Sequence, residues 1–502
     1  MKTVHCATYE GLDARVVDVE STLTKGLPSF SIVGMASTAI TESKERVKSA
    51  LLSNDFSFPP KRITFSLAPS ELSKSGSQFD LSIALLILLN TDESDLKDWF
   101  VFGELGLDGS VKESAQLYPL ILSLANQNLI TKAIVPNESL DKLSKIPNID
   151  FYGVSSITQT VNVFKNQDTV LPSVVNSGIE YPFYELEQKK YYYVKEYDED
   201  FSDVKGQEVA KRAALIAAAG FHNIIYEGSP GCGKSMIAQR LRYILPPMSE
   251  NEILELVKLQ VLDGKEVNFK PHRNSQSVHH TATLASIFGG GSFKAKIGEV
   301  GLAHNGILFF DELPHFSKSV LEALREPMQD KKIRISRVNS KVEYPASFLF
   351  IGAMNPCPCG NLLNQNKECR CSDLEVQRYK NRLSDPFLDR IDLNIVMQQV
   401  NATDKPSLSS KEMHKMVVQA HILGRKRGQK SFNALLNDKE IQMYCALSGE
   451  AEETLEKAID RFALSFRSIK KVQKVSRTIA DLCQSKTIEK EHLLEALSYR
   501  RR

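Results

Sequence analysis

The sequence has almost no excess of charge, since 63 lysine and arginine residues stand against 61 aspartate and glutamate residues among 502, a formal net charge of +2. This balance excludes binding to polyanions through overall charge, so any contact with nucleic acid must come from local basic clusters. Hydrophobic residues make up 42% and charged residues 25% of the chain, which is typical of globular domains and excludes a mostly disordered chain. At about 150 residues per domain, the length predicts roughly three domains.

Long hydrophobic runs are also missing. The longest, at residues 81–89, is far shorter than the roughly 20 residues that span a bilayer. Residues 1–15 contain His, Glu, Asp and Arg instead of the apolar core of a signal peptide. The cysteines do not form a disulfide framework, because four of the eight lie within residues 357–371 and the others are scattered singly. We therefore expect a cytoplasmic protein without a membrane segment.

The distribution of strand, helix and turn signals predicts an α/β multidomain fold. Residues 1–165 alternate between short strand-like and helical runs, which favours an α/β domain. The expected strands include 30–33 and 62–67, and the expected helices include 41–52 and 81–89. Residues 166–200 collect Pro, Ser, Asn and Gly and then charged residues and tyrosines, so we expect a linker with room for one ordered piece.

The remaining residues divide into a nucleotide-binding core and a helical region. Residues 201–400 follow the order helix, strand, glycine loop, helix and further strands, the pattern of a nucleotide-binding α/β layer. Residues 401–502 are predicted to be mostly helical, because apolar residues recur there at helical spacing. The expected helices are 452–466, 469–484 and 489–499.

One motif in the core indicates a phosphate-binding loop. Residues 228–235 match G-x-x-x-x-G-K-S in full, with a strand expected before them and a helix after them. The loop consists of Gly228, Ser229, Pro230, Gly231, Cys232, Gly233, Lys234 and Ser235. Its glycines let backbone N–H groups surround phosphate oxygens at a helix N-terminus. We expect Lys234 to neutralise the β- and γ-phosphates of ATP, and Ser235 to bind Mg²⁺.

Two later strands end in polar residues that complete such a site. The apolar run 307–310 ends in Asp311 and Glu312, which we expect to hold Mg²⁺ and to polarise the attacking water, respectively. The run 348–351 leads to Asn355, which is expected to orient this water. Either strand end alone is weak evidence, since polar residues often form turns. Because both strand ends follow a phosphate loop in the sequence, we predict that together they form a site that hydrolyses ATP.

This order of motifs resembles that of AAA+ ATPases, and longer stretches resemble the magnesium-chelatase-like family of the ComM/YifB type. The similarity extends from residue 26 to residue 500. The stretches that carry it are 279–282 (HHTA), 289–292 (GGGS), 298–299 (GE), 303–306 (AHNG), 324–327 (LREP), 354–360 (MNPCPCG) and 388–393 (LDRIDL).

The resemblance implies a ring of six identical subunits with ATP bound between neighbours. It implies that Arg390 is the arginine finger that reaches the γ-phosphate of a neighbouring subunit. It also implies that Arg467 is the second sensor arginine of a helical lid, and that Gln207 lies in the segment on the adenine side. Both arginine roles fit the chemistry of the guanidinium group, which spreads several donors over phosphoryl charge.

Residues 331–341 predict a hairpin with a basic tip, because apolar and polar residues alternate on both sides of Asn339 and Ser340. The segment has no acidic residue and five cationic ones, Lys331, Lys332, Arg334, Arg337 and Lys341. The resemblance implies that this hairpin points into the pore of the ring, where its cations would meet DNA phosphates. It implies a second pore element after the glycines at 289–291, with Phe293, Lys294 and Lys296. A solvated hairpin and a plain flexible loop are the alternatives.

Four cysteines follow Asn355 in the pattern C-x-C, nine residues, C-x-C. These residues are Cys357, Cys359, Cys369 and Cys371. Four thiolates can complete a tetrahedral zinc site, although C-x-C is tighter than the common C-x₂-C spacing. Structural Zn²⁺ is the preferred hypothesis, and reduced packing cysteines are the alternative.

The first 165 residues resemble the Lon-type protease domain but lack its serine–lysine dyad. Aligned with that family, Gln78 stands at the position of the serine and Tyr118 at that of the lysine. A nucleophilic serine needs an adjacent amine with a lowered pKa, so we expect an interaction or DNA-docking domain. Ser77 as the nucleophile, in a shifted register, is the alternative.

The leading hypothesis is an ATP-driven hexameric motor on DNA, a helicase or branch-migration translocase that needs ATP and Mg²⁺. The family implies a role in recombination or natural transformation, with recombination proteins as further partners. One rival is a chelatase-type ATPase that remodels a protein partner. A second rival is an ATP-dependent protease, which Gln78 and Tyr118 disfavour.

Overall fold

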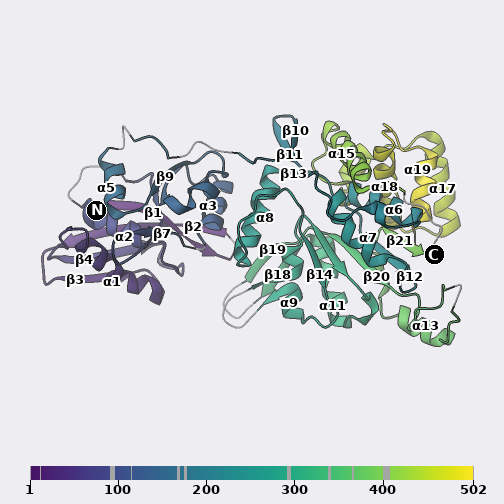
Figure 1. The fold of residues 1–502 in the computed structure, drawn as a ribbon, viewed down its shortest axis with the longest axis horizontal. Coiled ribbons are helices and arrows are strands. Elements are labelled where there is room, and N and C mark those ends of the chain that lie inside the picture. Colours follow the sequence, from purple (N-terminus) through teal and green to yellow (C-terminus); the bar gives the residue numbers. More distant parts are fainter. Residues whose placement is uncertain are drawn as a thin grey trace. The chain divides into compact units, whose positions relative to one another are not determined.

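The computed structural model confirms the α/β multidomain fold class. It describes residues 2–11, 13–90, 96–114, 116–166, 170–173, 178–290, 296–336, 341–364, 367–399 and 407–500. Contacts divide the chain into two compact units (Figure 1). Unit 1 comprises Met1–Glu180, Val257–Phe269 and Ser336–Val342, and unit 2 comprises Tyr181–Leu256, Lys270–Ile335 and Glu343–Arg502. Within the described ranges, no helix has both the length and the apolar character needed to cross a membrane.

A seven-stranded mixed sheet forms the centre of unit 1, in the order β3–β4–β2–β1–β5–β8–β9. β2 pairs antiparallel with β1 and with β4, and the other neighbours are parallel. Along β2, Val17 and Val19 are buried while Asp18 and Glu20 are partly exposed, the alternation of a sheet with one covered face. The strands are β1 (Lys2–Glu10), β2 (Asp13–Thr24), β3 (Ser29–Val33), β4 (Arg62–Ala68), β5 (Phe100–Val101), β8 (Lys132–Pro136) and β9 (Asp150–Val154), with a separate pair, β6 (Glu104–Leu105) and β7 (Val111–Lys112).

The helices of unit 1 supply the rest of its core. Helix α2 is buried from Asp80 to Ile87 and packs against α1, α5 and β1, while α3 packs on β2. These helices are α1 (Thr38–Leu52), α2 (Asp80–Leu88), α3 (Leu117–Asn126), α4 (Leu140–Leu143) and α5 (Ile157–Lys165). The strands predicted at 30–33 and 62–67 and the helices predicted at 41–52 and 81–89 are therefore confirmed.

Unit 2 is built on a five-stranded sheet in which all neighbours are parallel, in the order β14–β17–β20–β12–β21. All residues of β17 and β20 are buried, as expected for a parallel sheet covered on both faces. β20 lies between β12 and β17, so the ends of these three strands meet at one edge. The strands are β12 (Ile224–Gly228), β14 (Ser275–Val278), β17 (Ile307–Phe310), β20 (Leu349–Met354) and β21 (Leu393–Met397).

Short helices and two hairpins lie between β12 and β21 in the sequence. The hairpins are β15 (Gly289–Gly290) with β16 (Lys296–Ile297) and β18 (Lys332–Ser336) with β19 (Lys341–Pro345). The helices of this region are α7 (Lys234–Arg240), α8 (Glu250–Leu262), α9 (Leu284–Phe288), α10 (Glu299–Leu302), α11 (Lys318–Ala323), α12 (Arg325–Asp330), α13 (Asp373–Lys380) and α14 (Asp385–Leu388).

The C-terminal helices share one hydrophobic core with the sheet. Ile224 of β12 and Leu393 of β21 belong to the same buried cluster as Ala217 of α6 and Ile479 of α18. Helix α6 lies between the sheet and the lid helices and contains six buried alanines. The remaining helices are α6 (Glu208–Gly220), α15 (Ser410–Lys426), α16 (Asp438–Tyr444), α17 (Gly449–Phe462), α18 (Phe466–Leu482) and α19 (Lys490–Ser498) (Figure 1).

One helix differs from the sequence-based expectation, and the expected linker contains an ordered piece. The helix predicted at 452–466 is wrong at its end, because α17 stops at Phe462 and Ala463 takes a left-handed φ of 46°. Ser465 then caps α18 by accepting a hydrogen bond from the N–H of Ser468. Within the expected linker, β10 (Phe183–Leu186) and β11 (Lys189–Tyr192) form a hairpin that pairs with β13 (Met248–Ser249), so the ordered piece is a small antiparallel sheet.

Candidate active site

The phosphate loop joins the end of β12 to the start of α7, as the sequence predicts. Gly233 precedes α7 with a φ of 95°, a left-handed conformation that residues with a Cβ avoid. The chain therefore turns sharply enough to aim the first N–H groups of α7 into the loop, where they can bind phosphate oxygens.

Lys234 is held at the centre of this loop. Its ammonium donates to the carbonyl oxygens of Gly228 at 2.6 Å and Ser229 at 3.0 Å, and to Asn355 Oδ1 at 3.2 Å. Burial lowers the pKa of Lys234 from its ordinary value. A charged phosphate oxygen is a stronger acceptor than these neutral oxygens, so the amine is positioned to bind one. The hydrogen bond from Lys234 to Asn355 also brings together two residues whose roles were predicted from separate motifs.

Ser235 and Asp311 meet at the neighbouring strand end. Ser235 Oγ donates to Asp311 Oδ2 at 2.9 Å, and Asp311 follows the last residue of β17. A hydroxyl and a carboxylate are oxygen ligands of the kind that Mg²⁺ prefers, so this pair fits the predicted magnesium site. Glu312 takes a left-handed φ of 51° and its N–H donates to Asp311 Oδ1 at 2.8 Å, which fixes the two acidic residues relative to each other.

Gln207 also lies beside the phosphate loop. It precedes α6 with a φ of 59°, and its side-chain amide donates to the carbonyl oxygens of Cys232 at 3.1 Å and Gln398 at 2.5 Å. Gln207 thus connects the loop to the segment after β21. Its role on the adenine side stays a prediction.

His280 is a residue of the site to which the sequence analysis gave no role. It follows β14, and its Nδ1 lies 3.5 Å from Glu312 Oε2. A signal was available, because His280 is a polar residue two positions after a strand that ends at Val278, the same rule that selected Asn355. The pair places an imidazole next to the carboxylate that is predicted to act on water.

Replacing His280 by Ala should lower ATP turnover by about tenfold with little change in KM for ATP, because one contact that orients Glu312 is lost. The measurement is steady-state ATP hydrolysis. The matched control is His5→Ala, since His5 forms a similar histidine–carboxylate pair with Asp18 at 2.7 Å, in unit 1. Equal turnover in the His280 variant and the unaltered protein would refute a positioning role.

The two predicted arginines lie near enough for the charge of Arg467 to act on Arg390. Arg390 donates to the carbonyl oxygens of Arg325 at 3.0 Å and Pro386 at 2.5 Å, and to Gln329 Oε1 at 2.6 Å. Burial lowers the pKa of Arg390, and the positive charges of Arg467 and Arg325 lower it further. Arg467 is exposed in the first turn of α18. Among the described residues, no hydrogen bond joins either arginine to the phosphate loop of the same chain.

The hairpin of β18 and β19 carries the predicted DNA-contacting cations. Lys332 and Arg334 both bind Glu343 on the opposite strand, each at 3.0 Å, and these hydrogen bonds hold the pKa of Glu343 below its ordinary value. Lys331 lies before the hairpin, where its ammonium donates to the carbonyl oxygen of Met328 at 2.8 Å. Burial lowers the pKa of Lys331 to about 8, so Lys331 is less suited than the exposed Arg334 to meet a phosphate.

For the other predicted DNA-contacting residues, the structure gives the backbone alone or nothing. Arg337, Phe293 and Lys294 lie outside the described residues. Lys296 belongs to the backbone of β16 and Lys341 to that of β19. The predicted roles of these residues stay predictions.

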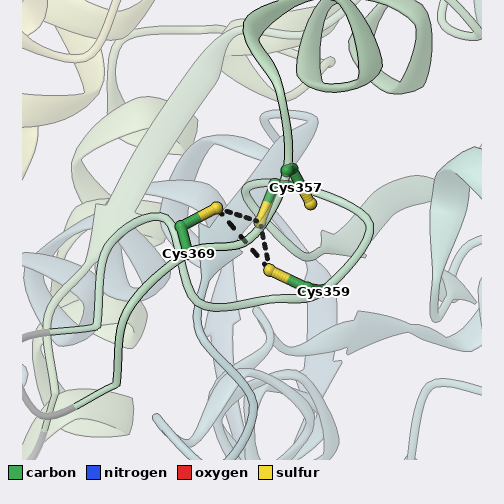
Figure 2. A group of neighbouring side chains, drawn as sticks. Cys357, Cys359 and Cys369 are labelled. Atoms are coloured by element: carbon green, nitrogen blue, oxygen red, sulfur yellow. Dashed lines mark hydrogen bonds between the residues drawn. The ribbon is translucent and has the colours of Figure 1, made fainter.

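The four cysteines after Asn355 lie close together, and Figure 2 shows three of them, Cys357, Cys359 and Cys369. Their Sγ atoms all lie within 4.8 Å of one another. Cys357 is buried, Cys369 and Cys371 are partly exposed, and Cys359 is exposed. The cluster lies on the segment between β20 and α13.

Gln78 and Tyr118, which stand where the Lon-type serine and lysine would be, are buried side chains of the core of unit 1. Gln78 is buried, and its amide donates to the carbonyl oxygens of Ala7 and Ser75. Tyr118 is buried too, and burial raises the pKa of its phenol well above the ordinary value. Ser77, the alternative nucleophile, donates its hydroxyl to Glu104. A carboxylate is not the amine that a serine–lysine dyad requires, so this contact does not favour the alternative.

Comparison with known proteins gives three family matches along the chain. Residues 200–405 match the family model described as magnesium chelatase, subunit ChlI, residues 19–139 match subunit ChlI of Mg-chelatase, and residues 407–500 match the C-terminal part of magnesium chelatase subunit ChlI. The chain is 37% identical to competence protein ComM of Haemophilus influenzae, over 99% of this chain and 97% of the relative. It is 36% identical to the uncharacterized protein YifB of Escherichia coli, over 100% and 97%. A match to the magnesium-chelatase 67 kDa subunit of Chlorobaculum tepidum, 27% identical, covers 31% of this chain and 23% of the relative.

Proposed function

The chain belongs to the magnesium-chelatase-like ComM/YifB family of AAA+ ATPases, and we propose that it is an ATP-hydrolysing hexameric motor that acts on DNA. The observation that carries the ATPase part is the meeting of Lys234 with Asn355 and of Ser235 with Asp311 at adjacent strand ends. These residues come from three separate motifs, and the sheet order brings them to one edge. A chance glycine turn would not explain that convergence.

The residues divide the work of hydrolysis among them. Lys234 neutralises phosphate charge, Glu312 polarises the attacking water, and Asn355 orients it. Ser235 and Asp311 hold Mg²⁺, which offsets the charge of the phosphate oxygens when it is bound. The proposal includes a structural Zn²⁺ bound by Cys357, Cys359, Cys369 and Cys371. Arg390, whose described hydrogen bonds go to Arg325, Pro386 and Gln329, serves the site of a neighbouring subunit. Arg467 acts as the second sensor arginine of the helical lid.

Two observations support DNA as the substrate. The relative from Haemophilus influenzae is named a competence protein. That name supports a role in natural transformation or recombination, in which the motor would act as a helicase or branch-migration translocase. Recombination proteins would be its partners. The exposed Arg334 lies on a hairpin between β17 and β20 in the sequence, so hydrolysis at those strand ends can move it. The proposed location is the cytoplasm, where thiols stay reduced and ATP and DNA are available.

The deciding experiment measures ATP turnover with and without single-stranded and forked DNA. DNA should stimulate ATP turnover. Arg334→Ala should weaken DNA binding about equally for all DNA sequences, and it should reduce the slope of the logarithm of the binding constant against the logarithm of salt concentration by about one. Lys457→Ala, on the exposed lid helix α17, is the matched control and should leave the salt dependence unchanged. The proposal fails if the unaltered protein neither binds DNA at low salt nor responds to it.

A second candidate function is a chelatase-type ATPase that remodels a protein partner. The family models and the partial match to the magnesium-chelatase 67 kDa subunit favour it. It predicts ATP turnover that DNA does not stimulate. The same experiment therefore separates the two candidates.

A further inference from the structure

The cysteine cluster has the dimensions of a tetrahedral metal site. Bonds of about 2.3 Å from zinc to sulfur, in tetrahedral geometry, place the sulfurs about 3.8 Å apart. The Sγ atom of Cys357 lies 3.4 Å from that of Cys359 and 3.7 Å from that of Cys369, and the last two are 3.6 Å apart. Figure 2 shows these three side chains pointing toward one another, and Cys371 Sγ lies within 4.8 Å of all three. Four thiolates in this arrangement favour Zn²⁺.

The segment that contains the cluster has no hydrophobic core of its own. Among its described residues from 361 to 371, none is buried, and Leu362 and Leu363 are 44% and 38% exposed. A stretch that buries so little apolar surface cannot offset the entropy of ordering it. Metal ligation supplies that free energy in small loops, so the fold of this segment depends on what the four thiolates bind.

The beginning of the segment lies against the nucleotide site. Asn355, which accepts from Lys234, precedes the first cysteine by two residues. Gly360 follows the second, with a φ of 78°, and a Cβ at this position would lie 2.7 Å from Cδ of Pro230 in the phosphate loop. The cysteine segment and the phosphate loop are thus in direct contact at the residue next to Cys359.

The end of the segment returns to the same site. Ser372 follows the last cysteine and caps α13, accepting from the N–H of Glu375. At the other end of that helix, Lys380 binds Glu227 at 2.8 Å, and Glu227 directly precedes the phosphate loop in β12. A closed loop therefore runs from Asn355 through the cysteines and α13 to the strand that carries the phosphate loop.

We propose that Cys357, Cys359, Cys369 and Cys371 bind one Zn²⁺ and that this ion positions Asn355 and the phosphate loop for ATP hydrolysis. The ion fixes the segment, and the contacts of Gly360 and Lys380 transmit that restraint to Pro230 in the phosphate loop and to Glu227 directly before it. Loss of the ion releases Asn355 and loosens the contact with the phosphate loop, whereas Lys234 keeps its hydrogen bonds to Gly228 and Ser229 within that loop, so turnover suffers more than nucleotide binding. The positioning role rests on the proposed ATPase function, whereas the metal site does not.

The first test is the metal content of the full-length protein, purified without added metal. We expect about one zinc per chain, and loss of that zinc in the double variant Cys369→Ser with Cys371→Ser. The matched control is Cys483→Ser, an exposed cysteine at the end of α18, which should keep the zinc. Co²⁺ introduced after chelation should give the visible absorption of tetrahedral sulfur coordination. Substantially less than one zinc per chain, or iron in its place, overturns the site.

The second test compares turnover with nucleotide binding. The double variant should lose about tenfold or more in kcat while its affinity for a fluorescent ATP analogue changes far less. Asn355→Ala should give the same kinetic loss and keep its zinc. Zinc removal by a chelator and its return give a second route if the double variant does not fold. A zinc-free protein with normal kcat overturns the positioning role, whereas an unaltered protein that contains zinc but hydrolyses no ATP overturns the proposed function instead.

Discussion

Replacing Glu312 by Gln should abolish most ATP turnover, by about a hundredfold or more, while ATP still binds. Glutamine keeps the shape of the side chain but cannot accept a proton from the attacking water. Lys234, Ser235 and Asp311 are untouched, so the phosphates and Mg²⁺ remain bound. The variant should therefore accumulate in its ATP-bound form, which retention of labelled ATP during gel filtration measures.

The control for this prediction is Glu453→Gln, an exposed glutamate that forms an ion pair with Lys457 on the helix α17. It makes the same chemical change far along the chain from the strand ends. Normal turnover in Glu312→Gln would show that another group activates the water, and the role assigned to Glu312 would be lost.

Replacing Arg390 by Ala should lower turnover by about a thousandfold if the guanidinium acts as an arginine finger. Its present partners are neutral oxygens of Arg325, Pro386 and Gln329. A phosphoryl group of a neighbouring subunit would be a stronger acceptor for the same donors. Arg390→Lys is the control for charge, since an ammonium lacks the planar fork and should restore little of the activity.

Mixing two inactive variants tests whether Arg390 acts across a subunit interface. In rings assembled at random from equal amounts of Arg390→Ala and Glu312→Gln chains, about a quarter of the interfaces pair an intact Glu312 with an intact Arg390 from the neighbour. Turnover should reappear in the mixture. If Arg390 acts within its own chain, each subunit carries one lesion and the mixture stays inactive.

Local patterns were sufficient to predict most of the elements that carry the site. A run of four apolar residues followed by Asp311 and Glu312, and a glycine loop between a strand and a helix, specify their own conformation over short distances. The end of α17 was harder, because apolar spacing continues past Phe462 and only the left-handed backbone at Ala463 ends the helix. Nothing in the side chain of an alanine signals that conformation.

The order of the strands could not be predicted from local patterns. The insertion of β20 between β12 and β17 depends on the pairing of β20 with β12, more than a hundred residues earlier in the chain, and this order is what brings Asn355 to Lys234. The ion pairs across the β18–β19 hairpin could not be predicted from local patterns for the same reason. Residues 331–341 contain no acid, yet Glu343, two positions further, neutralises part of the charge of Lys332 and Arg334 across the hairpin. The contact of His280 with Glu312 likewise joins residues on different strands.

The six buried alanines of α6 bear on how the lid can move. Helix α18 packs on this surface, and a methyl group has no rotamers to rearrange. A sliding displacement of α18 along α6 therefore needs less side-chain repacking than one between helices that interlock through large side chains, although it would break the buried hydrogen bond between His222 and Thr478 of α18. Arg467 lies in the first turn of α18, so a shear of this kind would change the reach of its guanidinium without unfolding any element.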